Sequence, residues 1–199
     1  RTISIIITVI FVISLYLAES LMNLFDLGSM VSSRAINAQK LGITFDERSK
    51  MEVIDDLRAN GVNAYPQFHP TISLKENGGL YDEDLGNIFP LSGASNKTTV
   101  YCNEGGEYLI YLSDRYGFNN LNSEWDKEEI DWLIVGDSFA HGACVEPNKN
   151  IGGQIKLLTG GDSVINLGNG GNGPLIELAT IKEYASNLNP RNILWIYYQ

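Results

Sequence analysis

The sequence predicts an α/β protein whose core is a parallel sheet, and the prediction rests on the last third of the chain. Apolar runs at 130–135, 163–167 and 192–198 have the length of buried strands. Helix-compatible segments at 151–158 and from 174 onward separate these runs, and glycines or a proline mark each link. A strand–helix–strand–helix–strand order with short links implies right-handed crossovers and parallel strands.

Length and charge narrow the class of protein. A chain of 199 residues suits one domain with a smaller appendage. Its net charge of -10 argues against a nucleic-acid binder, which needs a basic surface to neutralise phosphates. The acidic groups at 82–84 and 124–131 lack convergent partners, so we interpret them as solvated surface rather than as a metal site.

The N-terminal segment, residues 1–25, is predicted to be a transmembrane signal anchor. Residues 2–18 carry no charge and are rich in isoleucine and valine. As a helix they span roughly 25 Å, close to the ~30 Å hydrocarbon core of a bilayer. A cleaved signal peptide and a buried core helix are the alternatives. With Arg1 on the cytoplasmic side, the acidic remainder lies outside the cytoplasm, in the periplasm or at the cell surface.

Residues 26–126 are predicted to form a stalk helix, an irregular segment and a hairpin. The stalk covers 27–41, and Thr44 with Glu47 has the spacing of a capping box that opens a second helix. Gly61 is expected to end that helix. Prolines and glycines interrupt 62–96, whereas 99–101 and 107–111 flank a turn, as in a hairpin.

The two cysteines, Cys102 and Cys144, match no zinc site and no redox pair in their spacing. Cys144 is expected on the helix that follows Ser138, where a small buried apolar group is the simplest interpretation. A disulfide between the two is the alternative in an oxidising compartment. The sequence leaves this pairing open.

The segment 127–199 is the first part of the predicted α/β domain, and its first strand ends in a turn that carries candidate functional residues. The turn is Gly136-Asp137-Ser138. Glycine permits a sharp turn, and Ser138 then stands at the carboxyl end of a strand, where open α/β sheets bind ligands. The helix that starts there offers unpaired N–H groups and the positive end of its dipole to an oxyanion.

A second turn, residues 168–173, satisfies the dinucleotide fingerprint G-x-G-x-x-G between a strand and a helix. A dinucleotide-binding protein is therefore a competitor. The acidic residue expected about twenty positions later would fall near Tyr198, which is no carboxylate. A complete strand–turn–helix unit also precedes this turn, whereas the fingerprint strand normally comes early in its sheet.

Three segments resemble the SGNH (GDSL) hydrolase family. Residues 136–138 after an apolar strand resemble its first block, and Asn166 to Gly171 resembles its second block, Asn-x-Gly-x-x-Gly. Residues 114–120 resemble the Asp-x-x-Gly-Phe segment that precedes the nucleophile in membrane-anchored members. Three residues alone are ordinary turn chemistry, but two blocks in order, about 33 residues apart, are more specific.

The resemblance implies a three-layer, flavodoxin-like domain, truncated here after its third strand, and a serine ester hydrolase. Ser138 would be the nucleophile, and Gly171 would donate its N–H to the oxyanion. The supporting residues would be Gly136, Asp137, Asn166 and Gly168, with Asp137 a turn residue rather than the triad acid. The substrate would be an acyl ester. By analogy with membrane-anchored members of the family, this ester would be carried by an envelope glycan. The resemblance implies no metal and no cofactor. An O-acyltransferase and a non-catalytic SGNH-like binding protein are the alternatives.

A serine nucleophile needs a base, usually a histidine held by a carboxylate. The sequence contains only His69 and His141; we expect His69 to be structural and His141 to line the site. The family places its base in a late Asp-x-x-His block and a third oxyanion donor in a Gly-x-Asn-Asp block. Neither block occurs in 1–199, so we expect an N-terminal fragment that is inactive alone and continues into those blocks in its parent.

Overall fold

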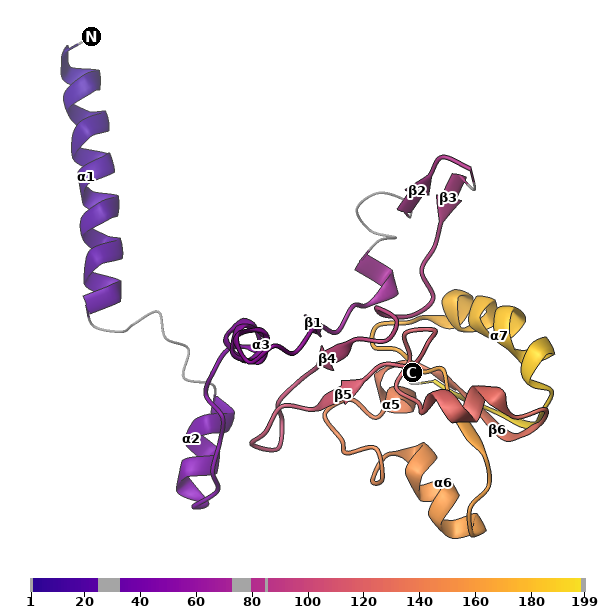
Figure 1. Ribbon diagram of the computed structural model, residues 1–199. Coiled ribbons are helices and arrows are strands. Elements are labelled where there is room, and N and C mark those ends of the chain that lie inside the picture. The colour runs from indigo at the N-terminus through magenta and orange to yellow at the C-terminus, as the bar shows by residue number, and fades with distance from the viewer. Residues whose placement is uncertain (1, 25–32, 73–79, 85, 198–199) are drawn as a thin grey trace. The chain divides into compact units, whose positions relative to one another are not determined.

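The computed structural model describes residues 2–24, 33–72, 80–84 and 86–197 (Figure 1). The protein is mixed α/β, with small sheets and an apolar N-terminal helix. It divides into two compact units, residues 1–47 and 48–199. The domain boundaries expected after residues 25 and 126 stay predictions.

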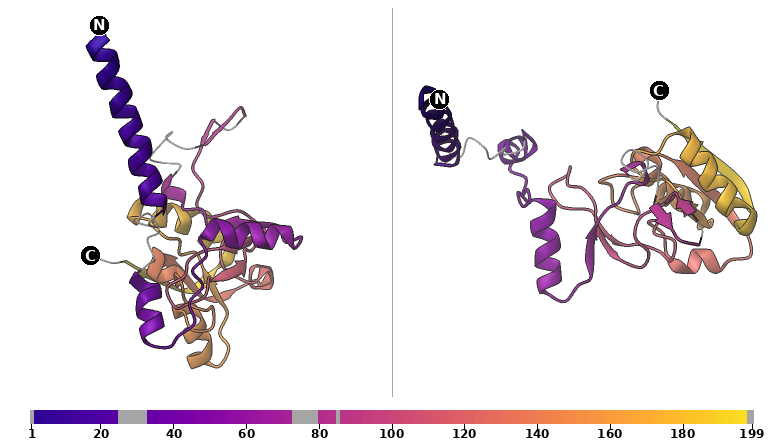
Figure 2. Two further views of the ribbon diagram at one scale, coloured as in Figure 1. Left: turned by 90° about the vertical axis from the view of Figure 1, so that its left-hand side faces the viewer. Right: turned by 90° about the horizontal axis from the view of Figure 1, so that it is seen from above.

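The described residues of the N-terminal unit form two helices. α1 (Thr2–Leu24) is one uninterrupted helix (Figures 1 and 2), and its 19-residue stretch Ile3–Leu21 is long and apolar enough to cross a membrane. The hydroxyls of Thr8 and Ser14 donate to carbonyls one turn earlier, so these polar groups are satisfied within the helix. α2 (Ser33–Lys40) lies in the predicted stalk, whose residues 27–32 are outside the described part of the chain.

The second unit opens with α3 (Lys50–Ala59), and here the predicted capping box is wrong. Ser49, not Thr44, is the N-cap: Ser49 Oγ accepts from the amide of Glu52, and Glu52 Oε2 accepts from the amide of Ser49 at 2.6 Å. Thr44–Glu47 and Ser49–Glu52 share one pattern, so the pattern could not choose between them. The predicted end is confirmed by the C-cap at Asn60, which Gly61 follows with φ 79°.

A three-stranded sheet packs beside α3. Its strands are β1 (Ala64–Pro66), β4 (Thr98–Val100) and β5 (Ile110–Leu112), in the order β1-β4-β5. β4 and β5 are antiparallel, which confirms the predicted hairpin, while β1 runs parallel to β4. β2 (Leu80–Asp82) and β3 (Gly86–Ile88) form a separate antiparallel ribbon within the segment expected to be irregular.

The predicted parallel sheet is present. It consists of β6 (Ile130–Gly136), β7 (Val164–Asn166) and β8 (Pro190–Ile196), and β6 is the middle strand. The helices α6 (Ile151–Thr159) and α7 (Pro174–Leu188) follow β6 and β7 as expected, with Pro174 at a first helical position. The third strand starts two residues earlier than predicted.

Alternate side chains of β6 enter two different cores. Leu133 and Val135 join a cluster that includes side chains of α7, whereas Ile134 joins a cluster that includes side chains of α6. This is the period of two that a strand with apolar contacts on both faces must show. In the described part of the chain, β8 pairs with β6 alone. Ile193 and Trp195 are 47% and 42% exposed, so the buried third strand predicted from the sequence is not seen.

Candidate active site

The turn after β6 requires glycine at Gly136. Its φ is 155°, and a Cβ there would lie 2.2 Å from the carbonyl oxygen of Ile196 and 2.8 Å from Cβ of Ala140. Any side chain would therefore collide with β8 and with the next helix. The tight fit brings the chain from the middle strand directly into α5 (Ser138–His141).

Ser138 occupies the first position of α5, a single helical turn. Asp137 caps the helix, because its Oδ1 accepts from the amide of Phe139 at 2.9 Å, and Gly142 ends the helix in the left-handed conformation. This geometry agrees with a turn role for Asp137. Cys144 lies beyond the end of the helix, in the loop, which corrects its predicted position on the helix.

The second predicted block follows β7 and packs directly on α5. The amide of Asn169 donates to the carbonyl of Gly136 at 3.1 Å, and a Cβ at Gly168 would lie 2.4 Å from the amide nitrogen of His141. The two turns predicted to carry the chemistry therefore meet at the carboxyl ends of β6 and β7. At Gly168 the contact between the two turns leaves no space for a side chain.

The backbone amides of both predicted oxyanion donors are uncommitted. Among the hydrogen bonds between described residues, none uses the amide of Ser138 or of Gly171. Gly171 is exposed and has a φ of 76°, which favours glycine, and Ser138 is half-buried. Backbone amides at a helix start and in a glycine turn are the donors that stabilise an oxyanion.

His141 is built into the core of the site rather than presented to a substrate. It is 3% exposed, and its Nδ1–H donates to the carbonyl of Gly168 at 3.1 Å. Burial lowers the pKa of His141 to about 4, with a further contribution from His69 nearby. A general base works best with a pKa near the working pH, so both burial and pKa disfavour that role. His141 holds the second turn in place.

His69 comes from the segment after β1, and its contact with the site was not predicted. Its Nδ1–H donates to the carbonyl of Gly170 at 2.8 Å, and Gln67 Nε2 donates to Asn169 Oδ1 at 3.0 Å. A Cβ at Gly170 would lie 2.6 Å from both the His69 ring and the hydroxyl of Tyr101. The expected structural role of His69 thus has a specific form: residues 67–69 pack over the glycine-rich turn.

No family model, curated protein or solved structure matches the chain.

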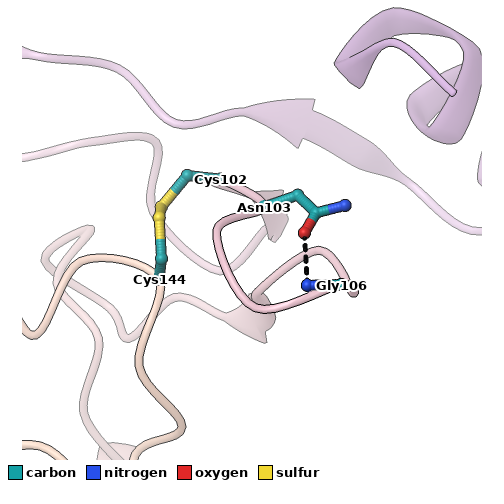
Figure 3. Close-up of a disulfide and its surroundings, with 4 residues drawn as sticks. All are labelled: Cys102, Asn103, Gly106 and Cys144. Carbon is teal, nitrogen blue, oxygen red and sulfur yellow. Dashed lines mark hydrogen bonds between the residues drawn. A yellow bond between two sulfur atoms is a disulfide. The ribbon is translucent and has the colours of Figure 1, made fainter. Parts of the chain in front are cut away.

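A disulfide connects the two cysteines, whose pairing the sequence left open (Figure 3). Cys102 Sγ bonds Cys144 Sγ, with their Cα atoms 5.3 Å apart. Cys102 begins the turn of the hairpin, where Asn103 Oδ1 accepts from the amide of Gly106 at 2.9 Å. The bond ties the loop after α5 to the hairpin, so the interpretation of Cys144 as a buried free thiol is wrong.

The described surface also contains a cavity of about 620 Å³ between β5 and the start of α6. Its lining includes Tyr111, Asn119, Asn120 and Asn166, but neither Ser138 nor Gly171. Neither the predicted nucleophile nor the predicted oxyanion donor at Gly171 therefore lines this cavity. Among the described residues, no three His, Cys, Asp or Glu side chains converge as metal ligands would.

Proposed function

We propose that this protein is a membrane-anchored serine ester hydrolase of the SGNH type, with Ser138 as its nucleophile. One observation carries the proposal. Ser138 follows the middle strand of a parallel sheet, and the turn that carries it packs against the turn that leads to Gly171, while the amides of Ser138 and Gly171 are both uncommitted.

The strand order supports the SGNH fold. In chain order the strands of the parallel sheet are arranged 2-1-3, which matches the start of the flavodoxin-like order 2-1-3-4-5. In such sheets ligands bind outside the carboxyl ends of the strands, at the switch point between the first and third strands. Ser138 follows β6, the first of these strands, and Gly136 touches the end of β8, the third.

The proposed reaction is an acyl transfer in two steps. Ser138 Oγ attacks the acyl carbonyl carbon while a base takes the hydroxyl proton, and the amides of Ser138 and Gly171 hold the oxyanion. The alcohol leaves with the proton, and water then cleaves the acyl-enzyme. The resemblance assigns the base to an Asp-x-x-His block, which residues 1–199 do not contain. A sugar hydroxyl in place of water would make the protein an acyltransferase.

The dinucleotide interpretation of residues 168–173 is less well supported. A pyrophosphate must approach the backbone of the glycine-rich turn closely. The space beside Gly170 is filled by the His69 ring and the Tyr101 hydroxyl. The residue that follows β8 in sequence is Tyr197, which is no carboxylate.

Covalent labelling tests the proposed nucleophile. A fluorophosphonate probe should modify the full-length protein at Ser138, because the probe mimics the acyl group and its oxygen occupies the oxyanion site. Peptide mass spectrometry locates the modified serine. Labelling at another serine, or no labelling of protein that is folded by circular dichroism, would argue against Ser138 as the nucleophile.

An NAD-binding measurement tests the dinucleotide interpretation. Tight NAD binding that is lost in Gly170→Val would favour that interpretation over the hydrolase.

The proposed topology places the acidic domain outside the cytoplasm, anchored by α1. The positive-inside rule applied to Arg1 favours this orientation, and a disulfide persists in an oxidising compartment. Alkaline phosphatase fused after Asn120 should be active, and β-galactosidase fused at the same place should be inactive. The reverse pattern, or release of the protein by carbonate, would contradict the anchored topology.

The proposed substrate is an acylated envelope glycan, because the proposed location places the domain at the cell envelope.

A further inference from the structure

The segment 114–125, just before β6, folds around one buried carboxylate. Asp114 is 1% exposed. Its Oδ1 accepts from the amides of Tyr116 and Phe118, both at 2.9 Å, and its Oδ2 accepts from Asn120 Nδ2 at 2.9 Å and Trp125 Nε1 at 2.8 Å. Burial raises the pKa of the Asp114 carboxyl, and the four donors oppose this rise by stabilising its charge. The carboxylate thus fixes the position of the Asn120 side chain.

The Asn120 amide binds the backbone of the last residue of β7 in both directions. Asn120 Oδ1 accepts from the amide of Asn166 at 2.8 Å, and Asn120 Nδ2 donates to the carbonyl of Asn166 at 3.0 Å. Among the described strands, β7 lies at an edge of its sheet, so this amide takes the place of a neighbouring strand at one residue. A side chain needs an adjacent donor and acceptor to do this, as an amide has.

The side chain of Asn166 then joins the two turns of the proposed site. Its Nδ2 donates to the carbonyl of Ala140 at 2.6 Å, and its Oδ1 accepts from the amide of Gly168 at 2.9 Å. Ala140 lies in α5, which starts at Ser138, and Gly168 starts the turn that leads to Gly171. Together with the bonds from His141 to Gly168 and from Asn169 to Gly136, Asn166 therefore sets the position of α5 relative to the second turn.

We propose that Asn120 is a positioning residue for acyl transfer at Ser138. It transmits the fixed position of Asp114 to Asn166, which in turn holds α5 and the second turn together. This inference rests on the proposed hydrolase function. It assigns a role to residues 114–120 that needs no contact with substrate, because every bond in the series runs between protein groups.

The variant Asn120→Asp tests the role with almost no change of shape. The introduced carboxylate keeps the acceptor for the amide of Asn166 but replaces the donor with an oxygen that faces the Asn166 carbonyl and Asp114. Displacement of reacting groups by about 1 Å costs about 10²-fold in rate. We expect kcat for p-nitrophenyl acetate to fall by about 10²-fold, with KM within about twofold of wild type, because binding contacts are unchanged.

Protonation should partly rescue this variant. A carboxylic acid has one donor and one acceptor, as the pairing with Asn166 requires, and Asp114 is the charged group that faces it. The ratio of variant to wild-type kcat should therefore rise as the pH is lowered. Asn122→Asp is the matched control: its side chain accepts from the amide of Arg115 and does not touch Asn166, so its kcat should stay near wild type at every pH.

The outcomes separate the two proposals. Wild-type protein without esterase activity or fluorophosphonate labelling would refute the hydrolase function, and the positioning role with it. Active wild type together with unchanged kcat in folded Asn120→Asp would refute the positioning role alone, as would a loss seen only in KM. If Asn120→Asp does not fold, Asn120→Ser, which removes the paired bonds without adding charge, takes its place with the same expected fall in kcat.

Discussion

Ser138→Ala should lower ester turnover by at least about 10³-fold in the full-length protein, because loss of a serine nucleophile typically costs several powers of ten. The substitution removes only the attacking oxygen. The amide of residue 138 stays at the start of α5, and Asp137 still caps the helix through Phe139. Substrate binding and the oxyanion donors are therefore retained, so the loss should appear in kcat. Steady-state hydrolysis of p-nitrophenyl acetate measures it.

The control for this variant is Ser123→Ala. Ser123 is exposed on the short 3-10 helix Asn122–Asp126 and belongs to neither turn of the site, and its loss should leave turnover within about twofold of wild type. Turnover by Ser138→Ala above about a tenth of wild type would mean that another group performs the chemistry. In that case the two turns take no part in the measured turnover, and a binding role is the better account of them.

The parallel sheet could be predicted because its signals are local. Each strand of the sheet is a short apolar run, and Pro174 and the glycines mark where helices begin and end. The turn at Gly136 could be predicted for the same reason, since a strand, a glycine and a capping residue follow one another directly. Local pattern was not enough for α3, where Thr44 and Ser49 offer the same capping box.

The rest of the site depends on contacts between distant residues. His69 and Gln67 reach the glycine-rich turn across about a hundred residues of sequence, from a segment without any periodic pattern. Nothing in the order of residues encodes which turn they cover. The flanking of His69 by Phe68 and Pro70 was the only local hint of a packed position. Asn120 and Asn166 are likewise distant in sequence, and they come into contact only in the folded protein.

The pairing of Cys102 with Cys144 is a further long-range contact, and removal of it should have the largest effect on stability. The bond closes a loop with a sequence separation of 42. The chain-entropy model assigns a loop of this size about 4 kcal/mol of stabilisation. For a domain of this size that corresponds to a fall in Tm of about 10 °C. The double variant Cys102→Ser with Cys144→Ser should show this fall by circular dichroism.

Reductant provides the internal control for this prediction. Dithiothreitol should lower the Tm of the wild type toward that of the double variant and leave the Tm of the double variant unchanged. Alkylation of the untreated, denatured protein should find no free thiol, since the described chain holds both cysteines in one bond. Two alkylated cysteines, or a reductant effect below about 2 °C, would contradict the disulfide. The result also bears on the site, because Cys144 lies six residues after Ser138 and the bond fixes the loop that follows α5.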